Sequence, residues 1–207
     1  MIDPQSPHKI QTSMNHQLWI DGVGGFLLCT KPTIAIGSGD AVDFAIRAPI
    51  SRHHATLEFA DDHWVWWQLH DPTRTTQILT RDFQELQLNH GVALGFSQPH
   101  PWSQTAFLDL RSSHRSQLGV DGCVLMSREC LIGPTADCHI QCRDWTETIV
   151  LSRTMTEFQW HRLADVRPGS QTLSKQRLPI DETLTLKYSN SDEVQIRLEN
   201  LEFSKVD

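Results

Sequence analysis

The 207-residue chain is predicted to be an all-β protein made of two tandem β-sandwich domains. Its first half is a series of short runs rich in β-branched and aromatic residues, separated by clusters of Gly, Pro, Asp and Asn. No window of a dozen residues keeps apolar side chains at helical spacing without an interrupting Pro or Gly. The second half repeats the outline of the first. Regularly spaced short strands of this kind are typical of a sandwich.

The runs expected to be strands in the first half are residues 25–29, 33–36, 55–59, 63–69, 77–79, 92–96 and 106–110. The polar stretch that follows has nothing to bury, so a linker is expected there. The predicted organisation is a flexible N-terminal tail over residues 1–17, a sandwich over 18–110, a linker over 111–117 and a second sandwich over 118–207.

The internal repeat is visible as a series of matched segments in the same order. Residues 122–127 match 25–30, 131–133 match 34–37, 136–140 match 42–46, 158–160 match 63–66, 178–184 match 88–94, and 194–198 match 105–110. A duplicated β unit explains this order, with one-residue gaps between segments.

Composition excludes several classes of function. The net charge is −7, whereas nucleic-acid binding usually needs a clustered basic face, so no nucleic-acid partner is expected. The longest apolar runs are far shorter than a membrane span, and residues 1–17 lack the apolar core of a signal peptide. Five cysteines, an odd number, do not form a disulfide framework. A cytoplasmic protein with reduced thiols and no membrane contact is predicted.

Three spaced elements carry a family resemblance. Gly37 ends one predicted strand, Ser51-Arg52-His53-His54 follows fourteen residues later, and Gly91 and Gly95 lie in a later turn. This arrangement over residues 18–110 resembles the forkhead-associated (FHA) family, whose FHA/SMAD-like sandwich binds phosphothreonine peptides through loops at one end. The resemblance implies that Ser51 donates its hydroxyl to phosphate, that Arg52 adds positive charge, and that His54 braces the loop from inside.

The sequence departs from the family pattern at two places. Ser38 stands where the family has a phosphate-binding Arg, and residues 70–77 contain no Asn-Gly pair, so Thr75 or Thr76 takes the place of the missing Asn. A phosphoryl group carries almost two negative charges and needs several donors. We expect Arg47, Arg52 and Arg74 to converge and rebuild the anion site. The alternative is that these arginines are solvated loop charges.

Other chemistries fit the sequence less well. In the second repeat, residues 145–148 take the place of 51–54 and cannot bind phosphate, so this unit is interpreted as degenerate and structural. On a strand, Cys138 and Cys142 share one face while His139 points to the other, so no metal or cofactor is expected. No nucleophile elbow accompanies Ser51, so no catalytic residue and no enzymatic activity are expected.

Two functional readings remain open from the sequence. The first is a signalling adaptor or scaffold whose first sandwich binds a protein partner phosphorylated on threonine. The second is a phosphate-independent assembly protein with two packed sandwiches. Within 63–67, Trp64 and Trp66 share one strand face and Val65 and Trp67 share the other, so one pair is expected to fill the core. The remaining indole covers the domain junction or a partner surface. The partner and the oligomeric state are not determined by the sequence.

Overall fold

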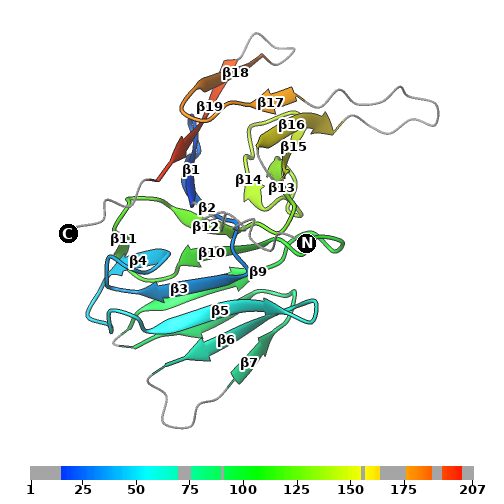
Figure 1. Cartoon of the computed structure of the whole chain (residues 1–207). Helices are drawn as coiled ribbons and strands as arrows, with labels where there is room; N and C mark the ends of the chain where they lie inside the picture. The colour runs from blue at the N-terminus through cyan, green and yellow to red at the C-terminus, as the bar shows by residue number, and fades with distance from the viewer. Residues whose placement is uncertain are drawn as a thin grey trace, which may run out of the picture.

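The computed structural model describes residues 15–69, 76–89, 91–154, 157–163, 176–187 and 193–201. These residues form strands, turns and irregular segments, and no helix occurs among them, so the predicted all-β class is confirmed. In the same residues there is accordingly no long apolar helix that could cross a membrane. Figure 1 shows two sandwiches, with the sandwich formed by the C-terminal half above the first.

The central layer is an eight-stranded sheet. In spatial order its strands are β18 (Thr183–Lys187), β19 (Glu193–Asn200), β1 (His16–Ile20), β2 (Gly24–Cys29), β12 (Gly122–Leu125), β10 (Ala106–Leu110), β9 (Ala93–Ser97) and β8 (Gln84–Gln87). Different parts of this one sheet therefore serve both sandwiches.

An outer sheet covers each end of the central layer on opposite faces (Figure 1). The first sandwich is closed by β11 (Arg115–Ser116), β4 (Phe44–Arg47), β3 (Thr33–Gly37), β5 (Ala55–Ala60), β6 (His63–Gln68) and β7 (Thr76–Leu79), in that spatial order. The second is closed by β14 (Ile140–Gln141), β13 (Glu129–Gly133), β15 (Thr148–Arg153), β16 (Phe158–Leu163) and β17 (Gln176–Leu178).

Strands β2 and β12 are parallel neighbours and contribute to both hydrophobic cores. Because successive side chains on a strand point to opposite faces, each strand divides its apolar residues between the two sandwiches. The first core receives Leu27, Cys29, Cys123 and Leu125, and the second receives Phe26, Leu28, Val124 and Met126. A strand buried on both faces has a continuous apolar sequence, as residues 26–29 do.

The N-terminal strand completes the second sandwich. Leu18 of β1 lies opposite Phe26, just as Leu108 of β10 lies opposite Cys123 in the first sandwich. Leu18 and Ile20 accordingly belong to the second core. The two halves are thus related by an approximate twofold axis along β2 and β12, with β1 taking the place of β10.

The strand ladders confirm part of the predicted repeat and correct the rest. Trp160 lies opposite Leu151 as Trp66 lies opposite Leu57, in agreement with the sequence match. However, Ile140 pairs with Ile132 as Phe44 pairs with Ile36, so Ile140 corresponds to Phe44 and not to residue 46. The turn before this strand spans eight positions in both halves, and the difference in length lies in the next loop: Phe44 is eleven positions before Ala55, whereas Ile140 is nine before Ile149. The sequence match placed this difference one turn too early.

The C-terminal matches are also displaced. Leu178 lies opposite Phe158 as Leu79 lies opposite Trp64, so β17 corresponds to β7 and not to the segment at residue 88. Since β19 pairs with β1, it occupies the place of β9 and not that of residues 105–110. In the second sandwich, β1 from the N-terminal end of the chain takes the place that β10 has in the first. Segments of the two halves therefore cannot be matched in sequence order at this point.

The segment boundaries also differ from those expected. Strand β1 begins at His16, inside the expected tail, and residues 1–14 lie outside the described part of the chain. The expected linker contains β11, where Arg115 pairs with Arg47, and the Gln117 amide donates to the carbonyl of Ala45 (2.8 Å). A polar segment can join a sheet edge in this way because ladder hydrogen bonds use only backbone groups.

Candidate functional site

The predicted phosphate-binding loop lies at one end of the first sandwich, between β4 and β5 (left in Figure 1). The end of β3 runs against it: the Ser38 amide donates to the carbonyl of Ser51 and the Gly39 amide donates to that of Arg52, both at 3.0 Å. A Cβ atom on Gly37 would lie 2.1 Å from the Arg52 carbonyl oxygen. Glycine is therefore required at residue 37 by this close backbone approach.

His54 holds the loop from inside the sandwich. Its side chain is buried, and its amide donates to the carbonyl of Ile36 (2.8 Å). The Gln68 side-chain nitrogen donates to His54 Nε2 (3.1 Å) and to the carbonyl of Leu88 (2.9 Å). The imidazole thus connects the β4–β5 loop to β6 and to the segment after β8.

The two serines of the site have different hydrogen-bonding states. The Ser38 hydroxyl donates to the carbonyl of Ile50 (2.7 Å), so it is engaged within the loop. The Ser51 side chain is half-buried, and in the part of the chain that the structure describes its hydroxyl forms no hydrogen bond. Ser51 is therefore the hydroxyl that remains available to an incoming acceptor.

Two arginines lie side by side at this end of the outer sheet. Arg47 ends β4 and pairs directly with Arg115 of β11, and like charges at opposed positions repel each other. Gln117 links Arg47 to the loop, because its carbonyl accepts from Arg47 Nη2 (3.2 Å) and its side-chain nitrogen donates to the carbonyl of Ser38 (2.9 Å). Arg47 and Ser38 are therefore joined through one residue.

Arg52 is exposed on the same loop, so three arginines belong to segments at the end where β3 and β4 terminate and β5 begins. Among the residues that the structure places, neither Arg47, Arg52 nor Arg115 forms an ion pair with a carboxylate. These three arginines therefore carry positive charge that no ion pair with a described carboxylate offsets, within a chain of net charge −7.

The other predicted residues are placed as follows. Thr76 is the exposed first residue of β7 and lies two strands from β5, about 10 Å across the sheet. Arg74 and Thr75 lie outside the described residues. Gly91 adopts a positive φ of 75° in the β8–β9 turn, and a Cβ on Gly95 would meet Asp109. These two glycines shape the central sheet.

Sequence reasoning missed Arg115 and Gln117 because both lie in the expected linker. Their contribution depends on the pairing of β11 with β4, which brings residues about 70 positions apart into contact. A polar segment carries no local signal of such pairing.

The second sandwich has no equivalent site. Ile149 pairs with Ile132 as Ala55 pairs with Ile36, so counting back four residues from each places Trp145 at the position of Ser51, in a loop that is two residues shorter. The Trp145 side chain is buried in the second core. An indole that fills the loop from inside offers neither the hydroxyl nor the charge that a phosphate needs.

The cysteines are buried free thiols. Burial raises the pKa of Cys142 to about 12, with a smaller contribution from Cys138. His139 points away from the two thiols, and its Nδ1 accepts a hydrogen bond from the Leu131 amide (2.9 Å). Within the ranges described above, no three metal-ligating side chains come together.

The site therefore combines a free hydroxyl with three arginines that form no ion pair with a described carboxylate, which is a set of donors suited to an anion. Comparison of the chain with protein-family models, with curated proteins and with solved structures gives no match. The resemblance to the FHA family therefore stays a prediction from the sequence motif.

Proposed function

We propose that this protein is an adaptor whose first sandwich binds a partner phosphorylated on threonine at the β4–β5 loop. The observation that carries the proposal is the free Ser51 hydroxyl next to guanidinium groups that lack a carboxylate partner. A phosphoryl group supplies the charge and the acceptor oxygens that these donors need. The proposal places the protein in the cytoplasm and assigns it no enzymatic activity.

Arg47 and Arg115 supply the positive charge that the family obtains from the residue replaced here by Ser38. Two guanidinium groups paired across β4 and β11 repel each other when no anion is present. An anion bound between them removes this repulsion. Gln117 fixes the distance of Arg47 from the Ser38 end of the site.

The test is a binding titration with a degenerate phosphothreonine peptide library and with its unphosphorylated counterpart. Because a hydrogen bond to a charged group contributes about 1.5–3 kcal/mol, Ser51→Ala and Arg52→Ala should each weaken phosphopeptide binding about ten- to hundredfold. Arg143→Ala is the matched control, since Arg143 is an exposed arginine in the corresponding loop of the second sandwich. It should bind like the wild type.

A phosphate-independent assembly protein is the alternative function. It is favoured by the engagement of Ser38 with the Ile50 carbonyl and by the sharing of β2 and β12, which makes the molecule one rigid unit. Equal binding of the two peptide libraries, or no effect of Ser51→Ala, would contradict the adaptor proposal and support this alternative.

A further inference from the structure

A tryptophan side chain stands almost fully in solvent on the loop between β9 and β10. Trp102 is 89% exposed. Its loop is nevertheless well held: Arg81 Nη1 donates to the carbonyls of His100 (3.3 Å) and Ser103 (3.2 Å), and the Trp102 amide donates to His100 Nδ1 (3.3 Å). The exposure of the indole is therefore a property of an ordered loop.

The end of this loop is anchored to both sandwiches. Trp64 Nε1 donates to the carbonyl of Gln104 (3.0 Å), and the Gln104 side-chain nitrogen donates to Asp62 (2.8 Å). The Thr105 hydroxyl donates to the carbonyl of Glu129 in the second half (2.6 Å). A side chain presented by such a braced loop loses little conformational entropy when it binds, which favours tight association.

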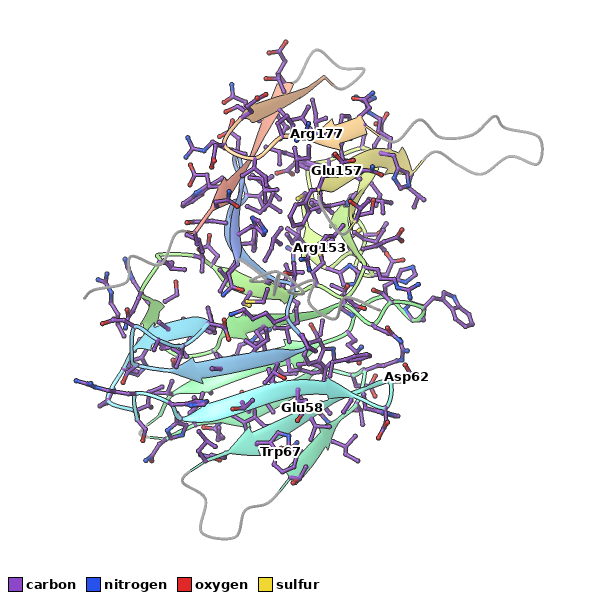
Figure 2. All side chains as sticks on the ribbon, viewed as in Figure 1. Glu58, Asp62, Trp67, Arg153, Glu157 and Arg177 are labelled. Carbon is purple, nitrogen blue, oxygen red and sulfur yellow. The ribbon has the colours of Figure 1, made fainter. Side chains whose placement is uncertain are left out.

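A groove with a volume of about 930 Å³ opens beside Trp102, between the two sandwiches. Its floor is the outer face of β13, β15 and β16 and includes Leu131, Val150 and Leu163, of which Leu163 is 48% exposed. Asp62, whose position is labelled in Figure 2, lies on the wall formed by the first sandwich. An exposed aromatic anchor and a floor that combines the exposed Leu163 side chain with polar residues such as Thr148 and His161 thus lie on one surface.

The signs of the charged residues in the groove indicate which partner binds there. Both signs are present in similar numbers, with Arg81 and Arg128 opposed by Asp62, Glu129 and Asp137. A surface of mixed sign lets the basic residues of one copy face the acidic residues of a second copy, whereas a partner of one sign would face like charges. In a twofold interface the same surface serves both copies, so each copy offers an anchor and a floor.

We propose that this groove is the interface between two copies of the chain, with Trp102 of each copy placed against the groove floor of the other. Aromatic anchors in desolvated pockets usually dominate the energy of such interfaces, with charged residues forming the rim. The rim charges here fix the relative orientation of the copies.

The interface leaves the proposed phosphate site open. Strand β5 begins at Ala55, next to the Ser51 loop, and ends at Ala60, next to Asp62, so the two surfaces lie at opposite ends of the first sandwich (Figures 1 and 2). A dimer would carry two phosphate sites, and a doubly phosphorylated partner would bind with avidity. This last consequence rests on the proposed function, whereas the dimer itself does not.

The test is sedimentation velocity of the full chain over about 1 to 100 µM. We expect a dimer whose dissociation constant rises about 30-fold or more in Trp102→Ala, as for a central aromatic anchor. Trp67→Ala is the matched control, because Trp67 is 42% exposed on the outer face of β6, away from the groove (Figure 2). It should dimerise like the wild type.

A second variant, Leu163→Asp, places a charge on the groove floor and should also prevent dimerisation. Circular dichroism spectra that match the wild type would show that each variant is folded. A wild type that stays monomeric over the whole range would overturn the proposal, and so would a folded Trp102→Ala variant that dimerises with unchanged affinity. Neither result depends on phosphopeptide binding, so the two proposals fail independently.

Discussion

His139 is a buried ionisable side chain whose protonation affects stability. It is 3% exposed, and its Nδ1 accepts a hydrogen bond from the Leu131 amide. Burial, with a smaller contribution from the nearby His100, lowers the pKa of His139 to about 4. The imidazole therefore stays neutral in the folded protein at a pH where the unfolded chain already binds a proton.

This depressed pKa predicts a loss of stability in mild acid. In the unfolded chain this histidine titrates near pH 6.5. The loss of folding stability that it causes is therefore absent above that pH and grows as the pH falls towards 4. The full shift corresponds to roughly 3 kcal/mol. His139→Asn keeps an acceptor but does not titrate, and urea unfolding between pH 7 and 4 should show a shallower decline for this variant. A slope equal to that of the wild type would contradict the prediction.

Two cysteine sulfur atoms lie close together where the two halves of the chain join. Cys29 Sγ and Cys123 Sγ are 3.4 Å apart, on the parallel strands β2 and β12. The register of the two strands places Cys29 opposite Leu125, two residues beyond Cys123. The Cα atoms of Cys29 and Cys123 are therefore about 8 Å apart, which is too far for a disulfide. Both thiols therefore act as small apolar side chains in the first core.

At the scale of single elements, the end of β3 positions the β4–β5 loop. Strand β3 and its equivalent in the second half, β13, both end in a glycine. A Cβ on Gly37 would meet the Arg52 carbonyl at 2.1 Å, and a Cβ on Gly133 would meet the Thr148 hydroxyl at 2.6 Å. Both glycines are thus closely packed, Gly37 against the β4–β5 loop and Gly133 against Thr148, the first residue of β15. Only the first contact involves a loop with donors for an anion.

This pair of glycines offers a matched test of the site. Gly37→Ala and Gly133→Ala should each destabilise the protein by about 1–3 kcal/mol, because the added methyl group forces the adjacent loop outward. Only Gly37→Ala should also weaken phosphopeptide binding, since it displaces the backbone of Ser51 and Arg52. Urea unfolding and peptide titration would separate the two effects. Intact binding in a destabilised Gly37→Ala variant would argue against a phosphate site at this loop.

The hairpin of β5 and β6 follows the sequence prediction. Trp64 and Trp66 are buried in the first core, and Trp67 is 42% exposed on the opposite face. Alternation along a strand is enough to assign these faces, because it depends only on the extended backbone.

At the scale of the whole molecule, the two halves are interlocked. Each core includes side chains from both β2 and β12, and β1, from the N-terminal end of the chain, completes the second sandwich. Neither sandwich can therefore bury its core with residues from its own half alone.

The interlocked sheet predicts a single unfolding unit. A fragment of residues 1–117 lacks β12 and leaves a gap between β2 and β10, so it should be unfolded on its own, as should residues 118–207. Calorimetry of the full chain should give one transition with equal van't Hoff and calorimetric enthalpies. Two separate transitions, or a fragment 1–117 that unfolds cooperatively, would show that the sandwiches are independent.

The candidate site was accessible to sequence reasoning only in part. Gly37, Ser51 and His54 belong to a short local motif, and the structure places them together at one end of the first sandwich. Arg115 and Gln117 come from a distant polar segment whose role depends on the β11–β4 pairing. Local patterns report residue chemistry, but they do not report which segments become neighbours.

The sequence by itself determined the all-β class, most strands of the first half (β1, β4 and β8 were missed), the existence of a repeat and which aromatic residues share a strand face. These follow from periodicity and turn residues, which act over a few positions. Only the tertiary structure decided that β2 pairs with β12, that β1 closes the second sandwich and that β11 joins the first. Ladder hydrogen bonds form between backbone groups that every residue except proline carries, so partner choice depends on the burial of the assembled cores.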